Sequence, residues 1–168
     1  MSLNPALEEV RFCPRCAQPA EVDFPRSVSC AHCGYGAYYN PKPVAAAITV
    51  TPDHKVILLR RGFDPGKGLW TFSGGFVDLG ETVEQAARRE AQEEIRATIE
   101  LTGLVGVYSR PQDRVILIVF AATTADAPQT TDEAPEVATF DRGELPWGEL
   151  AFWSTTNALE DFLSDESR

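Results

Sequence analysis

Beyond about residue 43, apolar and polar positions alternate in short runs that predict strands, with two longer amphipathic stretches that predict helices. Two β-branched runs at 44–50 and 56–60 flank Pro52, Asp53 and His54, which is typical of a β-hairpin. Further strands are expected at 69–72, 99–108, 115–122 and 136–140, helices at 82–97 and 154–163, and a polar acidic loop at 123–135. Strands mixed with a few helices indicate an α/β sandwich.

All four cysteines lie in the N-terminal segment, as Cys13, Cys16, Cys30 and Cys33 in the pattern C-x2-C-x13-C-x2-C. Two C-x2-C knuckles at this spacing predict a tetrahedral zinc site. Four thiolates would complete the coordination sphere, so the zinc would be structural and would supply folding energy to a segment too small for a large core. A redox dithiol pair, or a ribbon that has lost its metal, is the alternative.

Segments rich in proline suggest where the domains divide. Pro41 and Pro43 lie in a stretch that reads as a stiff linker, so we expect a zinc ribbon at 10–40 and a second domain at 41–168. The first nine residues do not resemble a signal peptide, and the longest apolar run, 115–122, is too short to cross a bilayer. We therefore expect a cytoplasmic protein without a membrane partner.

The helix expected at 82–97 carries three carboxylates on one face: Glu90, Glu93 and Glu94. At about 100° per residue, Glu90 and Glu94 fall in the middle of the apolar stripe, among alanines, and Glu93 falls at its edge. Ionised groups there are costly unless cations compensate them. An all-carboxylate site favours Mg²⁺ or Mn²⁺. A salt-bridge network with Arg88 or Arg89 is the alternative.

The segment 75–97 resembles the Nudix box, G-x5-E-x7-R-E-U-x-E-E-x-G-U, where U is a bulky aliphatic residue. The matching residues are Gly75, Glu81, Arg89, Glu90, Glu93 and Glu94. Arg96 stands where the family has glycine, and Ala91 and Ala97 are small for U. With the cysteine segment, the chain resembles the zinc-ribbon branch that includes NADH pyrophosphatases and plant FAD pyrophosphatase-like proteins. The resemblance implies a Nudix α/β/α sandwich with a small N-terminal zinc ribbon.

The resemblance also implies roles for individual residues. Glu90, Glu93 and Glu94 would hold Mg²⁺ or Mn²⁺, with the Gly74 carbonyl near one ion. Glu81 and Gly75 would support these ligands, and Arg89 would orient the glutamates by ion pairing. Either Glu90 or Glu136 is a candidate to take a proton from the attacking water; the alternative for Glu136 is an ordinary surface residue.

The implied substrate is a nucleoside diphosphate linked to another group, such as FAD, ADP-ribose or a similar dinucleotide. Arg60 or Arg61, at a strand end, would reach a phosphate, unless both are solvated. Trp70 and Phe72 would stack a base, unless they fill the core. The array S-Q-P-W-P-F-P-x-S of the NADH pyrophosphatases is missing, which argues against NADH.

The net charge of −10 and the pI of about 4.6 limit which classes of binding partner we expect. Such a chain repels a polyphosphate backbone, so the charge argues against nucleic acid as a partner and favours a small-molecule nucleotide. Removal of nucleotide caps from RNA, or a noncatalytic regulator that senses a nucleotide and binds a partner through its ribbon, are alternatives. Many members of the family are dimers, so a homodimer is possible.

Overall fold

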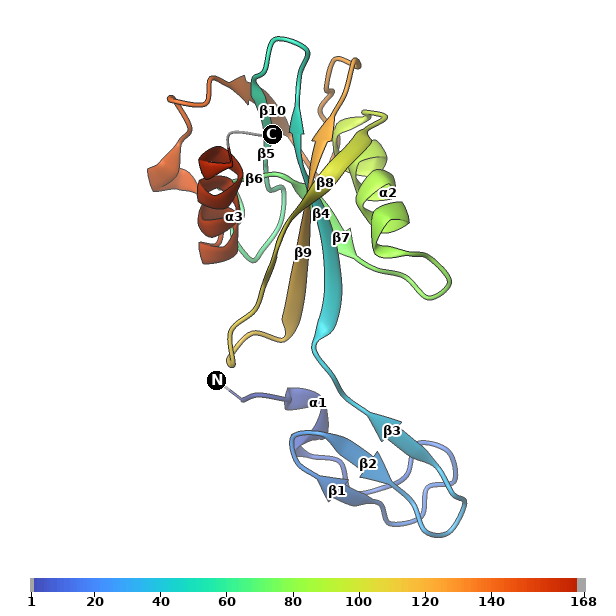
Figure 1. The fold of residues 1–168 in the computed structure, drawn as a ribbon. Coiled ribbons are helices and arrows are strands. Elements are labelled where there is room, and N and C mark those ends of the chain that lie inside the picture. Colours follow the sequence, from blue (N-terminus) through green and yellow to red (C-terminus); the bar gives the residue numbers. More distant parts are fainter. Residues whose placement is uncertain (1, 166–168) are drawn as a thin grey trace. The chain divides into compact units, whose positions relative to one another are not determined.

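The structure, a computed structural model that describes residues 2–165, separates into two units (Figure 1). The first unit comprises Met1–Lys42 with Arg110–Arg114, and the second comprises Pro43–Ser109 and Val115–Arg168. The domain boundary that the sequence suggests between residues 40 and 41 stays a prediction. No helix in the described part of the chain is long and apolar enough to cross a membrane.

The first unit is built around a three-stranded antiparallel sheet. Its elements are the helix α1 (Pro5–Glu8) and the strands β1 (Glu21–Asp23), β2 (Ser27–Ser29) and β3 (Gly36–Tyr38). The inner face carries a short apolar row, in which Val28 pairs with Val22 on one side and Ala37 on the other. Val28 is buried, but a core this small leaves the unit dependent on other stabilising groups.

The second unit is a seven-stranded sheet with helices on its two faces. The strand order is β10-β5-β4-β9-β8, with β6 paired to β5 and β7 paired to β4. The strands are β4 (Lys42–Val50), β5 (Val56–Arg60), β6 (Trp70–Thr71), β7 (Ser73–Phe76), β8 (Glu100–Tyr108), β9 (Val115–Thr123) and β10 (Glu136–Phe140). The helices are α2 (Val83–Ile95), α3 (Trp153–Ser164) and the 3-10 helix η1 (Trp147–Glu149).

Strand β4 shows why the sheet needs a helix on each face. Ala45 and Ala47 pack with the α2 side, whereas Ala46 and Ile48 pack with α3. Because successive side chains point to opposite faces, a strand buried on both faces reads as a continuous apolar run. Figure 1 shows α2 and α3 on opposite sides of the sheet. The unit is therefore a three-layer α/β/α sandwich, as expected from the sequence.

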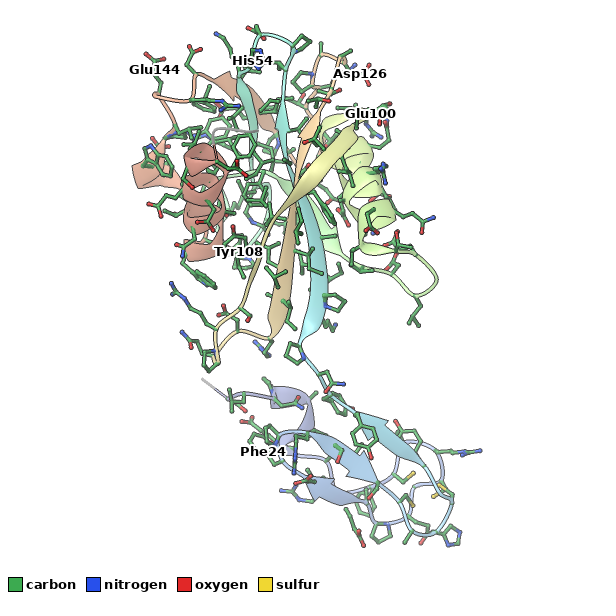
Figure 2. The ribbon with its side chains drawn as sticks, in the orientation of Figure 1. Phe24, His54, Glu100, Tyr108, Asp126 and Glu144 are labelled. Carbon is green, nitrogen blue, oxygen red and sulfur yellow. The ribbon has the colours of Figure 1, made fainter. Side chains whose placement is uncertain are left out.

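Helix α3 is also held to the sheet by a polar contact. The hydroxyl of Tyr108, at the end of β8, donates a hydrogen bond of 2.7 Å to Asp161 of α3 (Figure 2).

The strands expected at 99–108, 115–122 and 136–140 and the helix expected at 154–163 are confirmed within one residue at each end.

The strand expected at 69–72 is instead divided into β6 and β7. The chain changes partner at Phe72: Thr71 pairs with Leu59 of β5, whereas Ser73 pairs with Ala47 of β4. Gly74 and Gly75, which the sequence suggests follow the strand, consequently lie inside β7. This places them directly beneath α2, the helix with which β7 makes extensive contact.

Helix α2 begins and ends with defined caps. The predicted capping box is confirmed, because Thr82 and Gln85 each accept a hydrogen bond from the other's backbone N–H. At the other end Arg96 adopts a left-handed conformation with φ of 55°, and its N–H is bonded to the Ala91 carbonyl. The turn that the family makes with glycine is therefore formed here by arginine, at a conformational cost of about 1 kcal/mol.

Candidate functional site

The carboxylate of Glu94 is buried between α2 and β7. Only 5% of the residue is exposed, and its Oε2 accepts a hydrogen bond of 2.8 Å from the backbone N–H of Gly74. The helix approaches the strand this closely because the neighbouring residues on its inner face are alanines. The structure thus gives the Gly74 amide a definite role, while the Gly74 carbonyl as a metal ligand stays a prediction.

Gly74 and Gly75 are required for different reasons. A Cβ on Gly75 would overlap the carboxylate of Glu90, so this carboxylate occupies the space left by the missing side chain. A Cβ on Gly74 would instead lie 2.5 Å from the Ala46 Cβ and 2.9 Å from the Ala45 carbonyl oxygen. Gly75 therefore makes room for the site, whereas Gly74 makes room for the neighbouring strand.

Arg89 connects the loop before α2 to two of the three glutamates. Its Nε and Nη2 bind the two oxygens of Glu81 at 3.1 and 2.7 Å, and Nη2 also donates to the Phe76 carbonyl. Its Nη1 lies 2.7 Å from Glu90 and 2.9 Å from Glu93. The expected ion pairing is present, while Arg88 donates to the Glu84 carbonyl.

These contacts fix the charges of the pair. The hydrogen bonds that Arg89 donates to Glu81 raise the pKa of Arg89, and the same bonds, with one from the Asp78 N–H, lower the pKa of Glu81. Both groups therefore stay ionised, and Arg89 is a rigid support for Glu90 and Glu93.

The carboxyl groups of Glu94 and Glu90 have raised pKa values, in contrast to Glu81. Burial raises the pKa of Glu94 to about 8, and the charges of Glu90 and Glu133 add to this effect. Burial also raises the pKa of Glu90, although Arg89 opposes the shift. The repulsion between the buried carboxylate of Glu94 and the partly buried carboxylate of Glu90 favours a bound cation.

Glu133 is the acidic residue of this site that the sequence did not single out. It precedes β10, and its charge acts on both Glu90 and Glu94. The loop is anchored there: the Thr131 hydroxyl donates to the Glu94 carbonyl, and the Gly62 N–H donates to the Glu133 carbonyl. A loop carboxylate has no periodicity, so only its acidic composition could have marked it.

Glu136 is not part of the cluster formed by Glu90 and Glu94. Its carboxylate is 2.7 Å from the Arg60 Nε, and its side chain is 56% exposed. Arg60 also binds Glu149 at 2.9 Å and lies over the Trp70 ring, which belongs to the core facing α3. Glu136 is thus paired with Arg60 rather than gathered with Glu90 and Glu94, and this geometry does not favour the catalytic role expected for it.

The same geometry revises two of the substrate contacts expected from the sequence. Trp70 and Phe72 are each only 4% exposed and lie in the core, where Trp70 also meets the edge of Phe140. They therefore offer no free ring face to a nucleobase. Of the two arginines, Arg60 donates to the Gly68 carbonyl and pairs with Glu136 and Glu149. The Arg61 guanidinium instead interacts electrostatically with Glu94.

The four cysteines form the second candidate site, in the first unit. The Sγ atoms of Cys13 and Cys33 are 3.7 Å apart, as are those of Cys16 and Cys30, and all four lie within 4.8 Å of one another. Four thiolates at about 2.3 Å from one zinc ion would have edges of about 3.8 Å, so the geometry fits a tetrahedral site. None of the four is in a disulfide.

The two knuckles have the same backbone geometry. The Ala17 N–H donates to the Cys13 carbonyl and the Gly34 N–H donates to the Cys30 carbonyl. Ala17 and Gly34 have φ of 57° and 70°, so alanine adopts the left-handed conformation that glycine takes in the second knuckle. Among the described residues, no other group of three potential ligands converges as closely.

Comparison with known proteins agrees with this architecture. The family model described as "NUDIX domain" matches residues 41–163. An ADP-ribose pyrophosphatase of Methanocaldococcus jannaschii is 38% identical over 123 residues, 70% of this chain and 71% of that protein. The NAD-capped RNA hydrolase NudC of Haemophilus influenzae is 33% identical over 103 residues, 60% of this chain but only 39% of NudC.

A solved structure extends the likeness to almost the whole chain. The NUDIX hydrolase from Nitrosomonas europaea superposes with a TM-score of 0.84 and 30% identity, covering 94% of this chain and 93% of that one. The family model covers the sandwich, and the solved structure extends the likeness beyond it. The chain therefore belongs to the Nudix family and is a Nudix pyrophosphohydrolase.

Proposed function

We propose that this protein hydrolyses the diphosphate bond of a nucleoside diphosphate linked to another group, with ADP-ribose, FAD or a similar dinucleotide as substrate. The observation that carries the proposal is the pair of inward carboxylates, Glu94 held by the Gly74 N–H and Glu90 seated over Gly75. The similarity to an ADP-ribose pyrophosphatase over 71% of that protein supports the substrate class. Water would attack phosphorus and release a nucleoside monophosphate.

The donor set suits Mg²⁺ or Mn²⁺. Glu90, Glu93 and Glu94 offer only carboxylate oxygens, which are hard ligands, and the Gly74 carbonyl would add another oxygen. The mutual repulsion of Glu90 and Glu94 supplies the electrostatic reason for a cation. When bound, a divalent ion neutralises phosphate oxygens and lowers the pKa of a bound water.

The residues of the chain would divide the remaining work. Arg89, held by Glu81, keeps Glu90 and Glu93 oriented toward one another. Glu133 is exposed at the rim of the cluster and is the better candidate to accept a proton from the attacking water, because Glu136 is occupied by Arg60. Glu90 is the alternative acceptor, and it already accepts a hydrogen bond from Arg89.

For the first unit we propose a structural Zn²⁺ bound by Cys13, Cys16, Cys30 and Cys33. The sulfur separations fit one tetrahedral ion, and the small core offers little other stabilisation. We assign this unit to residues 10–40 as a zinc ribbon and 41–168 to the hydrolase domain. Measuring the zinc content of the purified protein, and of its Cys30→Ser variant, tests the assignment: about one ion per chain is expected, and its loss in the variant.

Removal of an NAD cap from RNA is the second candidate, and the similarity to NudC favours it. The matched region covers only 39% of NudC, and the charge of −10 opposes binding of a polynucleotide. A small dinucleotide therefore remains the favoured substrate.

A substrate panel tests the proposal. The full chain is incubated with Mg²⁺ and with ADP-ribose, FAD, NADH, diadenosine polyphosphates, nucleoside triphosphates or NAD-capped RNA, and monophosphate release is followed by chromatography. Selective cleavage of ADP-ribose or FAD is the expected result. Preference for the capped RNA would favour the second candidate, and binding of a nucleotide without any turnover would favour a noncatalytic sensor.

A further inference from the structure

Arg61, the residue after β5, has a side chain that lies against two aromatic rings. Its guanidinium carbon lies 4.9 Å from the centre of the Phe63 ring and 5.1 Å from the centre of the Phe152 ring. Phe63 belongs to the loop between β5 and β6, and Phe152 is the residue that precedes α3. Two segments distant in the sequence thus meet on one arginine.

Only part of the hydrogen-bonding capacity of Arg61 is used. Its Nε donates to the Pro65 carbonyl at 2.7 Å, which fixes the direction of the planar group. The described residues supply no hydrogen-bond acceptor or ion-pair partner within bonding distance to the two terminal nitrogens. This contrasts with Arg60, whose three nitrogens all have partners among the carboxylates and a carbonyl.

The local backbone is built to hold this side chain in place. The Arg61 N–H donates to the Leu69 carbonyl at 3.0 Å, and the Arg61 carbonyl accepts from the Gly68 N–H at 2.8 Å. Gly66, with φ of 81°, packs against the Arg61 stem: a Cβ there would lie 3.5 Å from the Arg61 Cδ and 3.6 Å from the Phe152 Cζ. The loop therefore closes on the arginine and on Phe152 together.

Arg61 also lies near the cluster of glutamates. Burial lowers its pKa from the ordinary value, and the nearby charges of Glu94 and Asp64 oppose that shift, so the group remains a cation. A cation with two unused, parallel donors matches the oxygens of a phosphate group, because both bonds can form at once. Rings on its flanks restrict its rotation and reduce the entropy lost on binding.

We propose that Phe63 and Phe152 are positioning residues that hold the Arg61 guanidinium ready to bind a phosphate of the substrate through its two terminal nitrogens. The inference rests on the proposed function, since it concerns the diphosphate group on which that function acts. It separates the roles of two adjacent arginines: Arg61 binds substrate, and Arg60 ties β5 to β10 and η1.

The test compares the full-length variants Arg61→Ala, Phe152→Leu and Phe152→Tyr with the wild type. Binding of inorganic pyrophosphate in the presence of Mg²⁺ is measured by calorimetry, and kcat and KM are measured on the best substrate of the panel. Arg88→Ala is the matched control, because Arg88 is exposed on α2 and donates to the Glu84 carbonyl of its own helix. Thermal unfolding verifies that each variant is folded.

We expect Arg61→Ala to weaken pyrophosphate binding about tenfold or more, as for loss of one charged hydrogen-bonded contact. Phe152→Leu should weaken it by about threefold to tenfold and raise KM with little change in kcat, whereas Phe152→Tyr should restore both values. Arg88→Ala should bind as the wild type does.

The inference would be overturned if Arg61→Ala bound pyrophosphate as tightly as the wild type does. So would normal pyrophosphate binding and normal KM in Phe152→Leu, or a failure of Phe152→Tyr to rescue. If the wild type cleaves no nucleotide while pyrophosphate binding still depends on Arg61 and Phe152, the proposed function fails and the anion site stands.

Discussion

The backbone N–H of Gly74 donates a hydrogen bond of 2.8 Å to the carboxylate of Glu94, a group that is 5% exposed. One backbone donor offsets only part of the cost of burying an ionised carboxylate. Burial accordingly raises the pKa of Glu94 to about 8. The ionised site is therefore electrostatically unfavourable unless a cation or a proton binds there.

The stability of the metal-free protein should depend on pH in a direction set by Glu94. The folded carboxyl has a pKa of about 8, against 4.5 for the ordinary group that titrates in the unfolded chain. Between these values the folded state holds a proton that the unfolded state has lost, so the free energy of unfolding falls as pH rises. One proton corresponds to a slope of at most about 1.4 kcal/mol per pH unit.

Urea denaturation in a chelator, from about pH 5 to about pH 8, measures this slope. Glu94→Gln is the control, because it keeps the shape of the side chain and removes the titration. Most of the slope should disappear in that variant, leaving the smaller contribution of Glu90, whose pKa burial also raises. An equally steep slope in wild type and variant would contradict the account.

The two glycines of β7 should respond differently to substitution by alanine. In Gly75→Ala the new Cβ displaces the Glu90 carboxylate, so Mg²⁺ affinity and turnover should fall while the fold survives. In Gly74→Ala the Cβ meets the Ala45 and Ala46 backbone, so unfolding should become easier by about 1–3 kcal/mol. Chemical denaturation and Mg²⁺ titration of both variants separate the effects. A Gly75→Ala protein with normal metal binding would show that Glu90 does not need this space.

Arg96→Gly should stabilise the protein. Arginine pays about 1 kcal/mol for the left-handed conformation at the end of α2, with φ of 55°, and glycine does not. The melting temperature should rise by about 2–4 °C. Arg88→Gly is the matched control within the same helix, where glycine costs about 1 kcal/mol and should lower the melting temperature. A decrease in both variants would mean that the Arg96 side chain contributes more than its backbone costs.

Glu133→Gln and Glu136→Gln should have unequal effects on turnover. Glu133 acts electrostatically on Glu90 and Glu94, so loss of its carboxylate should reduce kcat by about 10²-fold. Glu136 is bound to Arg60 and 56% exposed, so its loss should change kcat by less than about threefold. Steady-state kinetics at saturating substrate and Mg²⁺ provide the comparison. The reverse order of effects would return the role of base to Glu136.

Local rules predict which glutamates of α2 face the sheet. The 3.6-residue period alone places Glu90 and Glu94 on the inner face of α2, and the pairing of Thr82 with Gln85 marks where that helix begins. The cysteine spacing likewise predicts the cluster in the first unit. In each case the determining residues lie within one element or one repeated turn.

Tertiary contacts decide what the sequence pattern left open. Glu133 joins the site because its loop is anchored to α2 and to Gly62, which no periodicity reveals. Trp70 and Phe72 are core residues because α3 covers their face of the sheet. Glu136 forms an ion pair with Arg60 because β10 pairs with β5 at these two residues. Gly74 and Gly75 lie within a strand because the chain changes partner at Phe72.

The most direct test of the central claim is monophosphate release from ADP-ribose, or from the best substrate of the panel, by wild type and Glu94→Gln across a Mg²⁺ titration. The account predicts saturable activation of the wild type by Mg²⁺. It predicts a loss of at least about 10²-fold in kcat/KM for a variant that remains folded. Equal turnover by the two proteins, or turnover that does not respond to Mg²⁺, would contradict a catalytic metal held by the glutamates of α2.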